Sequence, residues 1–334
     1  MKQYIQLIKI VLIIGTVYGV NKTGTTAAKF LSIEVGSNAV GMGGAFTSIA
    51  NDATAMYWNP AGLSFHDTKE VYFNHANWIA DISFDYFGIT FPMNNKSVLG
   101  FNITSVTMDE MEVTRYGNED TGETFRAADY AIGSTYALNL TDRFSVGFNG
   151  KYIQQSIANS HAKGFAVDFG TLFITPFGFT LGTSISNFGP KLRMSGDDLL
   201  IGADVDENIE GNNESVTGIL STDYFDLPLV LRIGVSDQFQ MGSRNQIIIS
   251  ADAISPNDNA NYINAGLKLQ LLDGLISLYA GGNSLFLDNA ESEFSLGGGI
   301  TIPQILNNSL SVHFTHEQMK FLGNSQQLSI SFNY

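Results

Sequence analysis

The sequence has no cysteine, few basic residues and no apolar run long enough to cross a membrane as a helix. Without cysteine, a disulfide framework, a thiolate metal site, a thiol nucleophile and a lipid-modified cysteine are excluded. Lys and Arg total 17 against 32 Asp and Glu, which gives a formal net charge of −15. Because phosphate binding needs a basic surface, nucleic acid is excluded as an expected partner.

The one apolar run at the N-terminus, within "MKQYIQLIKIVLIIGTVYG", extends from Ile10 to about Gly19 after two lysines. It is too short to span a bilayer and fits a secretory signal peptide over residues 1–19. Val17 and Gly19 are the small residues before the cleavage site. A membrane anchor or a buried strand is the alternative interpretation. We expect an exported protein.

Apolar residues alternate with small or polar residues in many segments of the chain, and these segments are rich in glycine and aromatic residues. In "FSVGFNGKY", for example, Phe144 and Phe148 share one face, and Ser145 and Asn149 share the other. A period of two predicts strands with one apolar face. We expect fourteen strands: 70–78, 82–91, 97–107, 127–139, 144–155, 164–174, 178–187, 227–238, 244–254, 261–271, 274–283, 293–302, 309–317 and 326–333.

The connections between these segments alternate in length. Short links such as "LTDR", "TPF" and "LDG" alternate with long ones, the longest between residues 188 and 226. Short turns on one side and long loops on the other are typical of outer-membrane barrels, as are strands of about 10 residues. The sequence therefore predicts an all-β, 14-stranded antiparallel transmembrane β-barrel over residues 70–334, in contact with the lipid bilayer of the bacterial outer membrane. A secreted β-sandwich or solenoid is the alternative.

Residues 20–69 lack the period of two and precede the first strand. A barrel of fourteen strands leaks unless something fills it, and irregular backbone at membrane depth must be enclosed by protein. We therefore expect residues 20–69 to form an N-terminal hatch, or plug, inside the bore, where Gly41, Gly43 and Gly44 allow close packing. A phosphate loop is excluded, because Phe46 stands where a dinucleotide loop needs its third glycine.

Charged residues on the small-residue faces of the strands are predicted to point into the lumen. Hairpin geometry sets Lys151 beside Asp168 and Arg232 opposite Asp252; Lys268 shares this face. Internal ion pairs that hold the plug are the first interpretation. Recognition of a charged ligand head group is the second.

The long loops are acidic, and loop 189–226 alone carries nine acidic residues. Its stretch "DVDENIEGNNES" resembles a calcium loop, but Ile209 replaces the required glycine and Ser215 the required glutamate. We expect solvated surface loops, with calcium binding as the alternative. Basic partners would be favoured at such a surface.

An enzyme is the least supported class. His313 and His316, three residues apart on a strand, point to opposite faces and cannot share a metal. No Gly-x-Ser-x-Gly elbow occurs. We expect no catalytic residues, cofactor or metal.

The segment "FLSIEVGSNAVGMGGAFTSIANDATAMYWNPAGLS" resembles the N-terminal segment of the PorV/PorQ family of outer-membrane proteins, and "NHANWIADISFDYFGITFP" resembles a further family segment. This family is similar, more distantly, to the FadL fatty-acid channels, with a fourteen-strand barrel, an N-terminal hatch and an Asn-Pro-Ala motif. The resemblance implies a hatch motif here. It comprises Gly41, Gly43, Gly44, Asp52, Trp58, Asn59, Pro60 and Ala61.

Two functions follow from the resemblance. PorV-type members are accessories of type IX secretion, which implies secreted cargo domains or a secretion translocon as partners. FadL-like members imply passive uptake of hydrophobic small molecules such as long-chain fatty acids. A lipid carrier needs an apolar tunnel, and candidate lining residues are Phe46, Met56, Tyr57, Trp58 and Phe65. Simple packing of these aromatic residues is the alternative.

Overall fold

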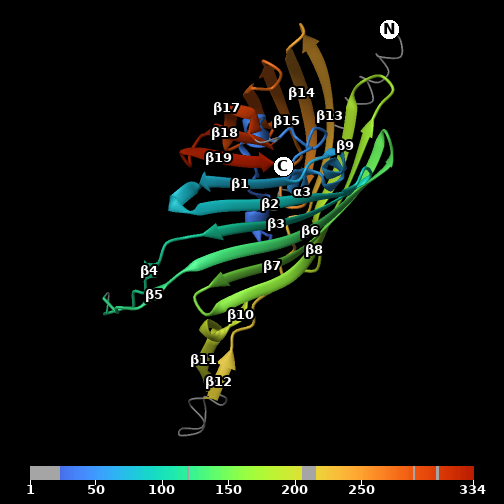
Figure 1. Ribbon diagram of the computed structural model, residues 1–334. Coiled ribbons are helices and arrows are strands. Elements are labelled where there is room, and N and C mark those ends of the chain that lie inside the picture. The colour runs from blue at the N-terminus through green and yellow to red at the C-terminus, as the bar shows by residue number, and fades with distance from the viewer. Residues whose placement is uncertain (1–22, 119, 205–215, 289, 306–307) are drawn as a thin grey trace.

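The computed structural model describes residues 23–118, 120–204, 216–288, 290–305 and 308–334 (Figure 1). Fourteen antiparallel strands form a closed barrel. They are β1 (Glu70–Asn77), β2 (Ser83–Asn94), β3 (Ser97–Thr107), β6 (Ala127–Thr141), β7 (Phe144–Ile157), β8 (Ser160–Ile174), β9 (Thr180–Phe188), β13 (Val230–Met241), β14 (Asn245–Pro256), β15 (Tyr262–Leu271), β16 (Ile276–Leu285), β17 (Ser292–Ile305), β18 (Asn308–Met319) and β19 (Asn324–Asn333). The predicted signal peptide, residues 1–19, lies outside the described residues.

The barrel closes because its first strand pairs with both the second and the last. Phe73 of β1 lies opposite Phe87 of β2 on one side and Ile330 of β19 on the other. Pairing of β8 with β9 completes the ring. The predicted fourteen-stranded antiparallel barrel is confirmed, and the strand bounds agree within a few residues. The largest difference is at β8, which begins at Ser160 rather than at residue 164.

Side chains alternate between an exposed apolar outer face and a buried polar inner face. On β7, Phe148 is 49% exposed, whereas the next residue, Asn149, is 1% exposed. On β8, Phe169 is 38% exposed and Asp168 is 1% exposed. This arrangement is the reverse of a water-soluble protein and suits a wall with acyl chains outside. It points to the bacterial outer membrane.

The long loops contain short elements that the sequence pattern did not predict. A hairpin of β4 (Met111–Glu112) and β5 (Thr124–Phe125) extends from β3 and β6. Loop 189–226 contains β10 (Ser195–Gly196), η5 (Asp197–Leu199), β11 (Leu200–Ala203) and β12 (Val216–Ile219). Figure 1 shows β4–β5 and β11–β12 projecting from the same end of the barrel. These strands are too short for a period of two to be visible in the sequence. The connection between β1 and β2 contains η4 (Ile79–Asp81).

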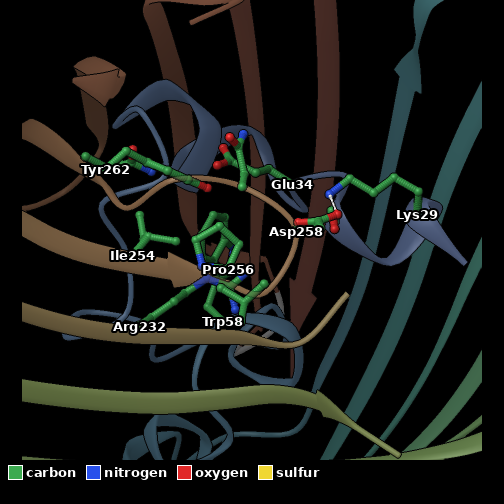
Figure 2. Close-up of a pocket in the computed structure, with 12 residues that line it drawn as sticks. Lys29, Glu34, Trp58, Arg232, Ile254, Pro256, Asp258 and Tyr262 are labelled. Atoms are coloured by element: carbon green, nitrogen blue, oxygen red, sulfur yellow. Dashed lines mark hydrogen bonds and ion pairs between the residues drawn. The ribbon is translucent and has the colours of Figure 1, made fainter. Parts of the chain in front are cut away.

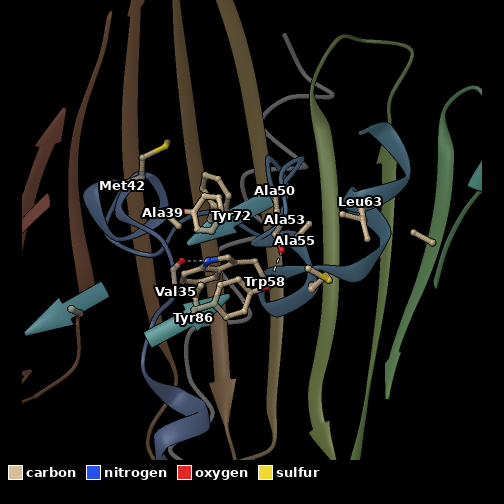
Figure 3. Packing of buried hydrophobic residues seen from close by; sticks show 14 of the residues in the cluster. Val35, Ala39, Met42, Ala50, Ala53, Ala55, Trp58, Leu63, Tyr72 and Tyr86 are labelled. Atoms are coloured by element: carbon tan, nitrogen blue, oxygen red, sulfur yellow. Dashed lines mark hydrogen bonds between the residues drawn. The ribbon is translucent and has the colours of Figure 1, made fainter. Parts of the chain in front are cut away.

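The N-terminal segment, residues 23–69, contains only short helices: η2 (Lys29–Ser32), α2 (Ser37–Gly41), α3 (Ala55–Trp58) and η3 (Pro60–Phe65). Its apolar residues pack with inner-face residues of the strands, including Tyr72, Tyr86 and Val98 (Figure 3). In the described part of the chain, we find no helix with the length and hydropathy needed to cross a membrane.

Candidate functional site at the inner face of the barrel

The stretch 41–44 lies against the barrel wall, and its three glycines stand where a side chain has no space. Gly43 and Gly44 have φ values of +64° and +72°, a region that favours glycine. A Cβ on Gly43 would lie 2.7 Å from the backbone nitrogen of Gly282 in β16. The Gly43 N–H donates to Ser295 Oγ of β17 at 3.1 Å. The glycines therefore let the main chain itself bond to the wall.

The Asn59-Pro60-Ala61 motif joins two turns of the segment to the wall. Asn59 Nδ2 donates to the Thr47 carbonyl at 2.8 Å and to the Thr171 carbonyl of β8 at 3.0 Å. Its Oδ1 accepts from the Ala61 N–H at 3.2 Å, which caps η3, and Pro60 takes the first helical position. A single buried amide thus satisfies three backbone groups.

Glycines in the strands make room for this motif. A Cβ on Gly147 of β7 would overlap the Pro60 carbonyl carbon, and one on Gly170 of β8 would overlap Asn59 Oδ1. By contrast, a Cβ on Gly150, on the outer face of β7 with Phe148, would meet nothing within 4 Å. The wall is therefore shaped at Gly147 and Gly170 to receive the segment.

Asp52 and Trp58 join parts of the segment to one another. Asp52 Oδ2 accepts from Asn38 Nδ2 at 2.7 Å, and its Oδ1 accepts from the Thr54 N–H at 2.9 Å. Trp58 Nε1 donates to the Val35 carbonyl at 2.8 Å. These bonds link α2, α3 and the chain before α2 into one unit.

Arg232 and Asp252 do not face each other as the sequence predicted. The register of β13 and β14 places Asp252 opposite Gly234, and Arg232 opposite Ile254. The turn between these strands is centred at residue 243 by this register, one residue beyond the position expected at Gly242. A shift of one residue in the turn moves the paired partner by two positions.

Asp252 instead binds the backbone of the N-terminal segment. Its Oδ2 accepts from the Phe46 N–H at 3.0 Å and from the Thr47 N–H at 2.8 Å. The carboxylate is fully buried, and within the described residues its Oδ1 has no hydrogen-bond partner. The side chain of Asp252 thus attaches this turn to β14 through two main-chain amides.

Arg232 packs against aromatic rings of the segment. Its guanidinium lies 5.5 Å from the ring centroids of both Tyr57 and Trp58, and Nη1 donates to Ser186 Oγ of β9 at 2.9 Å. Cation–π contacts are strongest when desolvated, and Arg232 is buried.

The structure does bring Lys151 and Asp168 together. Lys151 Nζ lies 2.9 Å from Asp168 Oδ1, and both side chains are buried. Asp168 also accepts from Asn149 Nδ2 at 2.9 Å and from the Asn187 N–H at 2.7 Å. Lys151 of β7 and Asp168 of β8 are diagonal neighbours rather than a directly opposed pair, because the residue opposite Asp168 is Asn149. The third predicted lumen cation, Lys268, lies 5.6 Å above the ring of Tyr279.

Glu34 is an acidic residue of this interface that sequence reasoning missed. Its Oε1 accepts from Asn283 Nδ2 of β16 at 2.9 Å. Burial, with a smaller contribution from the nearby Glu317 carboxylate, raises the pKa of Glu34 to about 8. The only sequence signal was a lone acidic residue within the apolar stretch "FLSIEVG".

The five candidate tunnel residues lie in packed surroundings. Phe46, Met56 and Trp58 are at most 2% exposed, and the Trp58 ring packs edge-on against Phe46 and Tyr57. A cavity of about 20 Å³ borders Met56 and Tyr57. Phe65, at the end of η3, is half-buried. The cavity has room for about one water molecule.

A larger cavity of about 70 Å³ lies between the segment and β13, β14 and β15 (Figure 2). It is lined by polar groups that include Glu34, Arg232 and Asp258. Asp258 Oδ2 accepts from Lys29 Nζ at 2.6 Å, which ties η2 to the loop after β14. The lining is suited to ordered water rather than to an acyl chain.

Solved structures with a similar fold are barrels of the FadL type. A FadL homologue of Pseudomonas aeruginosa matches with a TM-score of 0.53 and 13% identity, over 94% of this chain and 99% of the other. The toluene transporter TodX of Pseudomonas putida matches with a TM-score of 0.57 and 13% identity, over 90% and 97% of the two chains. At this identity the likeness concerns the fold alone.

No curated protein matches the sequence significantly. The family model described as "Type IX secretion system protein PorV" matches residues 19–201, which is more than half of the chain. The match includes the glycine-rich stretch, the Asn-Pro-Ala motif and the first seven strands of the barrel. The protein therefore belongs to the PorV family.

Proposed function

We propose that this protein is a non-enzymatic accessory of protein secretion in the outer membrane, with its bore closed by the N-terminal hatch and its long loops free to bind a partner. The attachment of the N-terminal segment to strands all around the ring carries this proposal. Ser329 of β19, Ser295 of β17 and Asp252 of β14 each bond to a backbone N–H of the segment. Asn149 of β7 donates to the Met56 carbonyl.

A barrel closed in this way suits a protein that binds others at its rim better than one that conducts a solute. Cavities that hold small organic ligands have volumes of about 300–1,000 Å³. The cavities described above, of about 70 and 20 Å³, are much smaller. Passive uptake of a fatty acid would require the hatch to shift and several buried hydrogen bonds to break. We therefore place FadL-like uptake of hydrophobic molecules second.

Two assays of the purified mature barrel separate these functions. Incubation with radiolabelled long-chain fatty acid should give no saturable retention, whereas a pull-down from the secreting organism should retain secreted proteins or translocon subunits. Deletion of the gene should also leave secreted proteins inside the cell. Saturable fatty-acid binding, with unchanged secretion in the deletion strain, would reverse the order of the two hypotheses.

A further inference from the structure

The loop between β9 and β13 forms an arm that stands away from the barrel (Figure 1). We define the arm as residues 191–204 and 216–226. Its stem is held by mutual backbone bonds of Leu192 and Phe225, at 2.8 and 2.9 Å. Lys191 pairs with Asp226 at 3.2 Å, and Arg193 lies 5.5 Å from the Tyr224 ring. Both basic residues of the arm are thus engaged within its stem.

The middle of the arm is fixed to the β7–β8 hairpin. Asp198 Oδ2 accepts from the Asn159 N–H at 2.7 Å and from Ser160 Oγ at 3.2 Å. These bonds lower the pKa of the Asp198 carboxyl, so it stays ionised. The distal strands β11 and β12 therefore extend from a fixed base.

At its distal end the arm is a two-stranded ribbon, and among the residues that the structure describes no strand pairs with either of its outer edges. Leu200 pairs with Ile219, and the Leu220 N–H donates to the Leu199 carbonyl at 2.9 Å. In an antiparallel pair, alternate residues point their N–H and C=O groups toward the partner strand. The groups of Leu200 and Gly202 on β11, and of Thr217 and Ile219 on β12, therefore point outward.

The ribbon also exposes apolar side chains on both faces. Leu200 and Ile219 are 45% and 69% exposed on one face, and Ile201 and Val216 are 41% and 40% exposed on the other. Within the described residues no further strand pairs with β11 or β12. Proteins usually protect such edges with charges, proline or a covering element, because an open apolar edge accepts another strand.

The charge of the arm indicates which kind of partner can bind at the edges of the β11–β12 ribbon. Residues 189–226 carry nine acidic and two basic residues by sequence, and both basic residues lie in the stem. A second copy of the arm would be repelled by like charge, as would an anionic membrane surface. An extended segment with Lys or Arg beside an apolar stretch would be attracted. Strand addition supplies affinity through main-chain bonds, and side chains supply the choice of partner.

We infer that β11 or β12 binds an extended segment of another protein as an additional strand, and that this segment is apolar with basic flanks. That the bound segment comes from a secreted protein or the translocon rests on the proposed function. That the segment is apolar with basic flanks is inferred from the arm alone. The arm therefore provides a binding edge outside the membrane, separate from the bore.

The probe is a fluorescent twelve-residue peptide in which valine and threonine alternate between two lysines at each end. Binding to the full mature barrel in detergent is followed by fluorescence anisotropy. We expect saturable binding that weakens with added salt, and about a tenfold or greater loss in the double variant Gly202→Pro, Thr217→Pro. Proline at these outward positions removes edge donors without removing a bond within the ribbon. The single variants identify the edge that is used.

Two controls keep the test specific. Thr124→Pro, in the β4–β5 hairpin, should bind the peptide like the unmodified protein, and a peptide with glutamate in place of lysine should not bind. Equal binding of both peptides, unchanged binding by the double variant, or binding to phosphatidylglycerol vesicles in place of the lysine peptide would overturn the inference. If the peptide fails to bind while gene deletion still blocks secretion, only the inference that the arm binds an additional strand is refuted. Binding with normal secretion in the deletion strain refutes only the proposed function.

Discussion

The N-terminal segment precedes the barrel strands and the arm connects two of them. The two regions differ in how their backbone polar groups are satisfied. The segment is buried, and its main chain bonds to side chains of β14, β17 and β19. The arm is exposed, and its distal ribbon leaves backbone groups and apolar side chains uncovered. The polar groups of the segment are therefore satisfied within the chain, whereas we propose that a strand of another protein satisfies those of the arm.

Removal of the buried charge at Asp168 should have the largest effect on stability. Asp168→Ala removes the ionic partner of Lys151 and leaves its Nζ bonded to Asn187 Oδ1; breaking a buried ion pair in this way typically costs about 3–5 kcal/mol. Urea unfolding of the barrel in detergent measures the loss. In the double variant Lys151→Ala, Asp168→Ala the loss should be smaller than the sum of the two single losses. Strict additivity would contradict a coupled pair.

A bulky residue at Gly147 should separate the segment from the wall. Gly147→Leu collides with the Pro60 backbone, whereas Gly150→Leu on the outer face of the same strand meets no other residue. We expect the first variant to raise ion conductance in planar bilayers and the second to leave the barrel closed. Equal conductance of both variants would show that the segment does not close the bore.

Protonation of Glu34 should make the attachment of the segment depend on pH. The folded pKa of about 8 lies above the ordinary value of 4.5, so the folded state binds the proton more tightly than the unfolded state. Stability from this group is complete below about pH 4.5 and is lost as pH rises through 8. Protection factors of the amides of residues 23–69, which are corrected for the intrinsic rise of exchange with pH, should therefore fall over this range. Glu34→Gln should remove that dependence; an unchanged profile would assign it to another group.

Exposed ion pairs at the end of the barrel should contribute least. Arg115 and Glu123 form a 2.7 Å pair in the β4–β5 region, with both side chains more than half exposed. Such pairs contribute about 0.2–1 kcal/mol. Arg115→Ala should therefore leave the urea midpoint nearly unchanged, in contrast to Asp168→Ala. A loss as large as that of Asp168→Ala would remove the distinction between exposed and buried contacts.

The sequence predicted the barrel well because strand alternation is a local property. Phe148 and Asn149 show their opposite environments within two residues. Side-chain partners depend on register, which local pattern does not determine. The predicted turn between β13 and β14 was wrong by one residue, so Asp252 was predicted to face Arg232. In the structure it binds the backbone of Phe46 and Thr47. The β11–β12 ribbon was missed because four residues are too few to show a period.

The location of the N-terminal segment inside the ring is the claim on which the account depends. Ser37 Oγ of α2 and Ser329 Oγ of β19 lie 2.9 Å apart, and the chain has no native cysteine to compete. Mild oxidation of the variant Ser37→Cys, Ser329→Cys in native membranes should form one reducible cross-link, seen as a gel shift absent from both single variants. A folded, membrane-inserted double variant that forms no cross-link would contradict the account.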